Sequence, residues 1–199
     1  MKRNIAVFVS GNGTNLGAII DSITAGSLNA RIALVVSDKK GAFALKRARK
    51  AGINTLYADP KKFATKQYYE KFIIERLKKD NVELIVLAGF MRILSPFIIK
   101  KYKNRILNIH PALLPAFKGA YAIRDAYSYG VKVIGVTVHF VDEKVDHGPI
   151  VLQGSETVSG LESIAELEKR IHKLEHKLYS IAIGKVLSGK LSIRGRRVE

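Results

Sequence analysis

Arg105-Ile-Leu-Asn-Ile-His-Pro-Ala-Leu-Leu-Pro115 is the stretch around which the rest of the chain is organised. Its apolar residues predict a buried strand, which Pro111 ends. Because side chains alternate along a strand, Asn108 and His110 are expected to point to the same side. An amide donor beside an imidazole is what a site needs to stabilise a developing oxyanion and to move a proton next to it. The pair alone leaves a second reading open, in which backbone groups satisfy both side chains.

The length and the lack of cysteine limit the class of protein. A chain of 199 residues is expected to form one domain that buries roughly 70% of its unfolded surface. The absence of cysteine excludes a thiol nucleophile, a disulfide framework and a Cys-ligated metal, and it is typical of a cytoplasmic protein. No stretch is long and apolar enough to span a bilayer, and the N-terminus does not resemble a signal peptide. We therefore expect a cytoplasmic protein with no membrane contact.

The chain is strongly basic, with a formal net charge of +17 from 34 Lys+Arg and 17 Asp+Glu. Such a charge favours anionic small substrates or a polyanionic partner. The lysines, however, are spread over the predicted helices without interleaved aromatic residues on which bases could stack. Residues 194–199 form the one segment that resembles a basic arm, and it is short. A solvated basic surface is therefore favoured, and a nucleic-acid-binding module stays as the alternative from another class.

A glycine turn follows the first predicted strand. Residues 4–10 form a near-continuous apolar run, which is typical of a strand covered on both faces in a parallel sheet. The turn from Gly11 to Gly17 leads into a helix, and backbone N–H groups at a helix N-terminus suit a phosphate. A dinucleotide site is the competing interpretation, because Gly11, Gly13 and Gly17 echo a Gly-x-Gly fingerprint and Asp38 follows the next apolar run. The last glycine spacing departs from that fingerprint, and a tight turn without a ligand is a third reading.

Strands and helices alternate along the remaining chain. We expect strands over residues 32–36, 54–57, 84–88, 131–140 and 150–153, the last two as an antiparallel pair, and helices over residues 42–50, 66–79, 96–102 and 123–129. Within residues 66–79 the aromatic residues Tyr69 and Phe72 are expected in the core. Three strands run into polar or glycine loops beginning at Ser10, Gly89 and Asn108, and in a doubly wound sheet such loops share the edge where ligands bind. The sequence thus predicts an α/β protein with a doubly wound, mostly parallel sheet.

A long C-terminal helix contains a motif that resembles a metal site. Residues 163–166 form a capping box that begins this helix. Its apolar face is assigned to Ile171, Leu174, Leu178 and Ile181. Residues 172–176 match the zinc-peptidase pattern H-x-x-E-H, but after His176 the only remaining carboxylate side chain is that of Glu199. A metal site is therefore not expected there.

Five segments, in this order, resemble the phosphoribosylglycinamide formyltransferase family of de novo purine synthesis: residues 10–15, 87–96, 108–115, 138–142 and 146–149. The resemblance covers nearly the whole chain and implies a Rossmann-like formyltransferase fold. It implies that a formyl group passes from 10-formyltetrahydrofolate to the glycinamide amine, without a metal or a nucleotide cofactor. A cytoplasmic monomer or homodimer with small-molecule substrates is expected. A formyltetrahydrofolate hydrolase, or a formyltransferase acting on methionyl-tRNA or an amino sugar, is the alternative, although those usually carry a further domain and lack this phosphate turn.

The resemblance also assigns roles to residues of this chain. It implies one domain over residues 1–199, with a phosphate-binding half over 1–100 and a catalytic and folate-binding half over 101–199. The catalytic trio would be Asn108, His110 and Asp146. The residues binding phosphoribosylglycinamide (GAR) would be Gly13, Thr14 and Asn15 at the phosphate and Glu175 at the ribose. Those binding formylfolate would be Lys66, Met91, Arg92, Ile93, Leu94, Asn108, Val141, Asp142, Glu143, Lys144, Val145 and Asp146.

Some positions depart from the commonest family pattern. His147 stands where a small or polar residue is more usual, and residues 117–119 replace a proline-containing loop. Lys66 occupies a position where some relatives have arginine. None of these differences removes a residue of the catalytic trio.

The chemistry of the trio fits formyl transfer. When an amine attacks the formyl carbon, negative charge develops on oxygen, and a preorganised donor such as Asn108 or His110 is worth about 3 to 4 kcal/mol there. We expect Asp146 to favour the cationic form of His110 and to raise its pKa above about 6.5. His110 would also help to move the proton between nitrogens, a gain of roughly 10² to 10⁴ in rate. Asp146 as a simple turn residue is the alternative.

Overall fold

The computed structural model of the chain describes residues 2–199. It contains two compact units, one ending at Leu107 and one running from Asn108 to Glu199. The strand order is β3-β2-β1-β4-β5-β6-β7, with β8-β9 as a separate pair. The pairs β1-β2, β1-β4 and β2-β3 are parallel, whereas β6-β7 is antiparallel. This order confirms the prediction of a doubly wound, mostly parallel sheet with an antiparallel strand pair.

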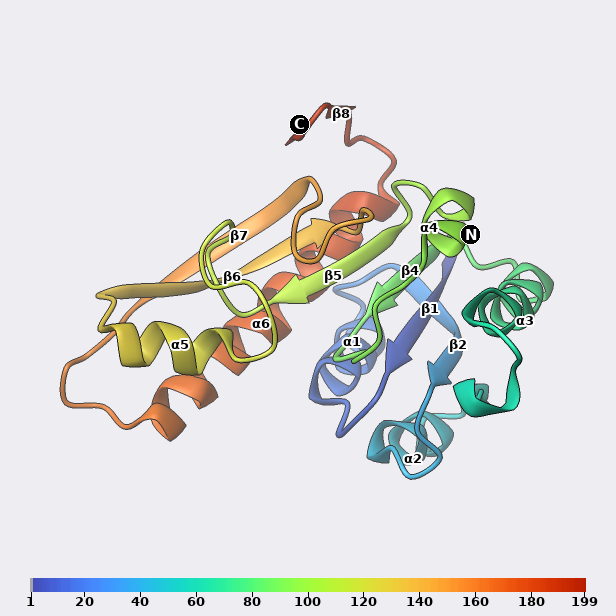
Figure 1. The fold of residues 1–199 in the computed structure, drawn as a ribbon, viewed down its shortest axis with the longest axis horizontal. Coiled ribbons are helices and arrows are strands. Elements are labelled where there is room, and N and C mark those ends of the chain that lie inside the picture. Colours follow the sequence, from blue (N-terminus) through green and yellow to red (C-terminus); the bar gives the residue numbers. More distant parts are fainter. Residues whose placement is uncertain (1) are drawn as a thin grey trace. The chain divides into compact units, whose positions relative to one another are not determined.

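The first unit is a wound α/β structure (Figure 1). Its elements are β1 (Arg3–Val9), α1 (Thr14–Thr24), β2 (Ala30–Ser37), α2 (Phe43–Lys50), β3 (Thr55–Tyr57), the short 3₁₀ helix η1 (Pro60–Lys62), α3 (Lys66–Lys79), β4 (Leu84–Leu87) and α4 (Pro96–Lys101). The chain winds outward from β1 to β3 and then returns to place β4 beside β1. Since parallel crossovers are right-handed, this reversal puts α1 and α2 on one face of the strands and α3 on the other. In agreement, α1 contacts α2, and α3 contacts α4.

The core of this unit explains its sequence pattern. All side chains from Ile5 to Val9 in β1 are fully buried, as expected for a strand covered on both faces. Tyr69, Ile73 and Leu77 form the buried stripe of α3. The prediction that Phe72 lies in the core is wrong, because its side chain is 42% exposed. At 100° per residue Phe72 falls outside that stripe, and its ring lies 5.4 Å from the ring of Phe63 instead.

The second unit holds the antiparallel strands and the long helix (Figure 1). The strand β5 (Ile106–His110) leads into it, and α5 (Ala122–Tyr129), β6 (Val133–Phe140), β7 (Ile150–Thr157), α6 (Ile164–Leu187), β8 (Ile193–Arg194) and β9 (Arg197–Val198) follow. The helix α6 contacts both β6 and β7. It begins with the predicted capping box, in which the Ser163 hydroxyl accepts from the Glu166 N–H and the Glu166 carboxylate accepts from the Ser163 N–H.

Two predictions about this unit need correction. Ile181 does not lie on the buried face of α6, since its side chain is 42% exposed. The buried stripe passes through Ile171, Leu178 and Ala182, and Ile181 sits beyond its edge. Residues 194–199 are not an extended arm, because most of them form the β8-β9 hairpin.

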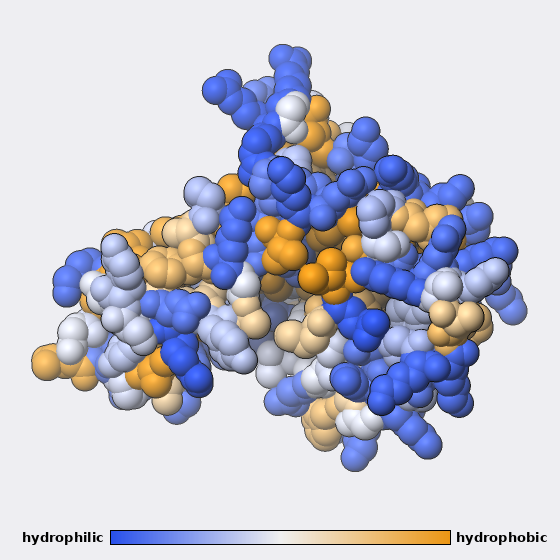
Figure 2. All heavy atoms as spheres, viewed as in Figure 1, coloured by the Kyte–Doolittle hydropathy of each residue, from blue (hydrophilic) through white to orange (hydrophobic). Residues whose placement is uncertain are grey.

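Hydrophilic side chains cover most of the surface in Figure 2, in keeping with the high content of lysine and arginine. Over residues 2–199, none of the helices is both long and apolar enough to cross a membrane.

Candidate active site

Three residues of the second unit form a compact polar cluster, as predicted. Asn108 and His110 lie two positions apart on β5, and both face the carboxylate of Asp146. The Asn108 amide nitrogen lies 3.4 Å from Asp146 Oδ1, and His110 Nδ1 lies 3.4 Å from Asp146 Oδ2. The His110 side chain is 5% exposed and that of Asp146 is 9% exposed. The alternation along β5 therefore brings an amide and an imidazole to one buried carboxylate.

Asp146 is held as a carboxylate in this cluster. It adopts a left-handed backbone conformation with φ of 46°, and its Oδ2 accepts the Gly119 N–H at 3.0 Å. Burial acts to raise the pKa of Asp146, but contacts with His139, the Gly119 N–H and His110 outweigh it, so the pKa lies below its usual value. The charged form is thus favoured in the folded protein.

The lowered pKa of Asp146 predicts how stability depends on pH. A carboxyl group whose pKa is lower in the folded than in the unfolded protein stabilises the fold above its unfolded pKa, and this contribution is lost as the pH falls through the folded pKa. The unfolding free energies of the wild type and of Asp146→Asn should therefore converge below about pH 4. Urea unfolding of both proteins between pH 7 and pH 3 measures this. A constant difference over that range would contradict the lowered pKa.

His139 is a member of the cluster that sequence analysis missed. It lies on β6, is 2% exposed, and its Nε2 lies 3.3 Å from the Asn108 amide nitrogen and 3.7 Å from Asp146 Oδ1. Its Nδ1 lies 2.8 Å from the Phe140 carbonyl oxygen, which only a ring N–H can satisfy. Through Nε2, His139 thus contacts both the Asn108 amide and the Asp146 carboxylate. Residues 138–142 are one of the five segments that resemble the formyltransferase family, so the histidine in that segment could have been recognised as a site residue.

Both ring nitrogens of His110 face hydrogen-bond acceptors. On one side lies Asp146, and on the other the Phe117 carbonyl oxygen is 2.7 Å from Nε2. Phe117 has φ of 46°, which non-glycine residues rarely adopt, and its ring packs edge-on against Tyr129 at 5.9 Å. An imidazolium can donate to both acceptors, whereas a neutral imidazole can donate to one. The arrangement suits a histidine that works as a cation.

The glycine turn of the first unit has the geometry expected of an anion site. Gly13 is the N-cap of α1 with φ of 73°, and an added Cβ would lie 2.5 Å from Ala44 Cβ. Both the backbone conformation and the close approach therefore require glycine there. Asn15 Oδ1 is buried and has no hydrogen-bond partner within residues 2–199. A carbonyl oxygen only accepts hydrogen bonds, so an anion at this turn would be bound by N–H groups at the start of α1.

A serine links this turn to the predicted folate segment at residues 91–94. The Ser10 hydroxyl donates to Asp38 Oδ1 at 2.6 Å and accepts the Met91 N–H at 2.9 Å. Asp38 therefore fastens the turn, which weakens the dinucleotide interpretation, where this carboxylate would bind a ribose. Met91 and Ile93 are 74% and 67% exposed, while Leu94 is buried. Two exposed apolar side chains offer contact area to an apolar ring.

The other predicted folate residues lie in both units. In the first unit, Lys66 is exposed at the start of α3, and the Arg92 guanidinium lies 5.7 Å from the centre of the Tyr69 ring. In the second unit, five of them lie in the turn between β6 and β7 that also carries Asp146: Val141, Asp142, Glu143, Lys144 and Val145. Of these, Val145 is 51% exposed.

Glu175, the predicted ribose ligand, lies in the H-x-x-E-H segment of α6. It is 5% exposed, and its Oε2 accepts from His172 Nδ1 at 2.7 Å. This hydrogen bond raises the pKa of His172 against the opposing effect of burial. Across residues 2–199, no group of three or more His, Asp or Glu side chains is arranged to hold a metal ion. The motif therefore serves as an ion pair that fixes the Glu175 side chain.

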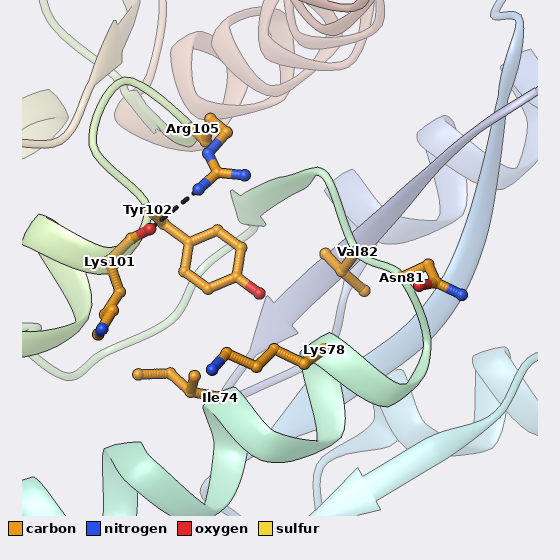
Figure 3. A pocket seen from close by; sticks show the side chains of 7 residues that line it. All are labelled: Ile74, Lys78, Asn81, Val82, Lys101, Tyr102 and Arg105. Carbon is orange, nitrogen blue, oxygen red and sulfur yellow. Dashed lines mark hydrogen bonds between the residues drawn. The ribbon is translucent and has the colours of Figure 1, made fainter.

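A cavity of about 310 Å³ lies in the first unit (Figure 3). Its lining contains none of the predicted site residues and consists of Ile74, Lys78, Asn81, Val82, Lys101, Tyr102 and Arg105. Two of its cations, Lys78 and Lys101, stand in the last turns of α3 and α4, where positive charge compensates the helix dipole. The third, Arg105, donates to the Lys101 carbonyl at 2.9 Å and lies 5.0 Å from the centre of the Tyr102 ring. The basic character of this cavity is thus explained by the fold.

Comparisons with known proteins agree on one family. The family model described as formyl transferase matches residues 3–183. A phosphoribosylglycinamide formyltransferase of Bacillus subtilis (strain 168) is 42% identical over 195 residues, which are 98% of this chain and 99% of that protein. The crystal structure of glycinamide ribonucleotide transformylase 1 from Symbiobacterium toebii is 44% identical, with a TM-score of 0.96 over 100% of this chain and 93% of that one. A formyltetrahydrofolate deformylase from Pseudomonas syringae is 25% identical, with a TM-score of 0.90, and this chain covers 65% of it.

Proposed function

The chain belongs to the formyl transferase family, and from that premise we propose that it transfers the formyl group of 10-formyltetrahydrofolate to the amine of GAR. The products are formyl-GAR and tetrahydrofolate, in de novo purine biosynthesis. One observation supports this most strongly: Asn108, His110 and Asp146 meet in a buried cluster whose two distances to the carboxylate are both 3.4 Å. The similarity to the Bacillus phosphoribosylglycinamide formyltransferase covers both proteins almost completely.

The cluster provides the chemistry that formyl transfer requires. The GAR amine attacks the formyl carbon, a C–N bond forms, and the carbonyl electron pair moves to oxygen. The Asn108 amide and the His110 imidazolium stabilise that oxyanion. The C–N bond to folate then breaks, and the proton lost by the attacking amine is passed, with the help of His110, to the leaving nitrogen. His110 gives a proton to the leaving nitrogen and recovers one from the attacking amine, and Asp146 stabilises the cationic form of His110 before and after this exchange.

The contact between His110 and Phe117 bears on how the substrate binds. His110 Nε2 donates to the Phe117 carbonyl oxygen. In the proposed reaction the same N–H donates to the formyl oxygen. The Phe117 carbonyl oxygen thus marks where an oxygen can accept a hydrogen bond from His110 Nε2.

The two substrates are assigned to separate sets of residues. For GAR, Gly13, Thr14 and Asn15 bind the phosphate and Glu175 binds the ribose, in keeping with the N-terminus of α1 and the fixed carboxylate of Glu175. For the folate, the turn at residues 141–146 and Asn108 contact the pteridine-bearing substrate, and Lys66, Met91, Arg92, Ile93 and Leu94 contribute from the first unit.

The proposal includes no metal or nucleotide cofactor. We place the enzyme in the cytoplasm as a monomer or homodimer with small-molecule substrates and no nucleic acid, organised as one domain with a phosphate-binding half (1–100) and a catalytic half (101–199).

An absorbance assay tests this function and separates it from the alternative. Purified protein is mixed with 10-formyltetrahydrofolate, with and without GAR, and the appearance of tetrahydrofolate is followed. We expect turnover only when GAR is present. Turnover without any acceptor would instead identify a formyltetrahydrofolate hydrolase, the activity suggested by the similarity to the Pseudomonas deformylase.

Replacing Asn15 tests the phosphate site. Asn15→Ala should raise the KM for GAR about tenfold, because one hydrogen bond to a charged group is worth about 1.5 to 3 kcal/mol. The KM for the folate should change less than twofold, which corresponds to a change in binding free energy of about 0.4 kcal/mol at most. Steady-state kinetics with each substrate varied in turn measures both constants. Asn29→Ala, an exposed asparagine of the same unit, serves as the matched control. Equal changes in the two KM values would refute the assignment.

A further inference from the structure

Asp142 folds the turn between β6 and β7 onto itself. Its Oδ1 accepts the Lys144 N–H at 3.0 Å, and its Oδ2 lies 2.6 Å from His147 Nδ1. The turn is also closed at its base, where the Phe140 N–H donates to the Pro149 carbonyl oxygen at 2.8 Å. His147 is the immediate neighbour of Asp146, so a group that holds His147 also fixes where the Asp146 carboxylate points.

The C-terminal hairpin presents an arginine from its tip. Ser192 and Glu199 exchange two backbone hydrogen bonds of 2.7 and 3.0 Å at the open end, and β9 contacts β7. Gly195, with φ of 61°, occupies the first position of the two-residue turn, where a type II′ hairpin requires positive φ. Arg196 is the second turn residue. The hairpin therefore gives Arg196 a defined backbone rather than that of a free tail.

Arg196 contacts the imidazole of His147. Its Nη1 lies 3.1 Å from His147 Nε2 and 3.3 Å from His147 Nδ1. Because the two ring nitrogens are nearly equidistant from Nη1, the guanidinium lies against the ring rather than in line with one lone pair. A planar guanidinium is suited to such a contact with a flat ring. The chain Arg196–His147–Asp142 thus connects the C-terminal hairpin to the turn that carries Asp146.

We propose that Arg196 is a positioning residue: by holding His147 from the hairpin tip, it fixes the turn that presents Asp146 to His110. The catalytic part of this inference rests on the proposed function. Asp146 itself has the left-handed backbone conformation with φ of 46°, which the surrounding turn has to maintain. Among the described residues, those at 142, 147 and 196 supply side-chain contacts that hold this turn from outside the buried cluster. His147, which contacts both Asp142 and Arg196, is the residue through which the hairpin acts.

The first test compares two arginines of the same hairpin. Arg196→Ala should lower kcat about tenfold, less than the roughly 10²-fold that a 1 Å misplacement can cost, while the KM for GAR stays within twofold. Arg194→Ala removes the same charge from an exposed position of β8 and should leave kcat unchanged. Wild-type kcat in Arg196→Ala, or equal losses in both variants, would overturn the proposal.

A second test asks whether Arg196 acts through His147. If it does, the double variant Arg196→Ala/His147→Ala should have the same kcat as His147→Ala within twofold, because coupled residues are not additive. A double variant whose loss of kcat equals the product of the two single losses would overturn the proposal.

Hydrogen exchange gives a readout that does not depend on activity. In the protein without substrates, the amides of residues 141–147 should exchange faster in Arg196→Ala than in the wild type or in Arg194→Ala. Unchanged exchange would overturn the proposal even if the enzyme formylates GAR. If Arg196→Ala exchanged faster but the wild type did not formylate GAR, the proposed function would be refuted, whereas the conclusion that Arg196 stabilises the turn would still be supported.

Discussion

Asp146→Asn is expected to lower kcat by about 10² to 10⁴ while the protein stays folded. The amide has nearly the shape of the carboxylate but carries no charge, so it cannot favour the His110 imidazolium. The amide also has only one acceptor oxygen, because an NH2 group replaces the other. In the wild type both oxygens face hydrogen-bond donors: Oδ2 accepts from the Gly119 N–H and faces His110, and Oδ1 faces Asn108 and His139. Whichever way the amide is turned, one of these contacts becomes a meeting of two donors.

Steady-state kinetics with saturating GAR and formyl donor measures the loss for Asp146→Asn. Circular dichroism and thermal unfolding show whether the fold is retained. Asp125→Asn, which makes the same change at an exposed position of α5, should keep wild-type kcat. If kcat of Asp146→Asn stayed within threefold of the wild type, Asp146 would not belong to the catalytic cluster.

Local sequence patterns correctly predicted most helices and strands and the two residues that β5 contributes to the site, Asn108 and His110. The periodicity over residues 66–79 matched α3 at both ends, and the capping box marked the start of α6. Alternation along one strand was enough to send Asn108 and His110 to the same carboxylate. These features depend on neighbours within a few residues, which is the range over which a sequence pattern carries information.

The contacts that complete the site come from distant segments and could not be read from periodicity. His139 reaches Asn108 from another strand, and the Phe117 carbonyl reaches His110 from a loop. Neither contact leaves a pattern in the residues around it. Single apolar residues at the edge of a helical stripe were misjudged for a related reason, as Phe72 and Ile181 show. Whether such a residue is buried depends on what packs against that edge.

His110→Asn should lower kcat at least as much as Asp146→Asn, by about 10² to 10⁴, because it removes both the cationic donor and the group that helps to move the proton. If Asp146 acts through His110, the double variant should be no slower than His110→Asn alone, since residues that work as a unit give non-additive losses. Single-turnover kinetics on the three variants measures this, with His176→Asn on α6 as a control for the loss of a histidine outside the cluster. A double variant whose loss equals the product of the single losses would mean that Asp146 acts on the substrate directly. In that case the carboxylate itself, and not His110, would help to move the proton from the attacking amine.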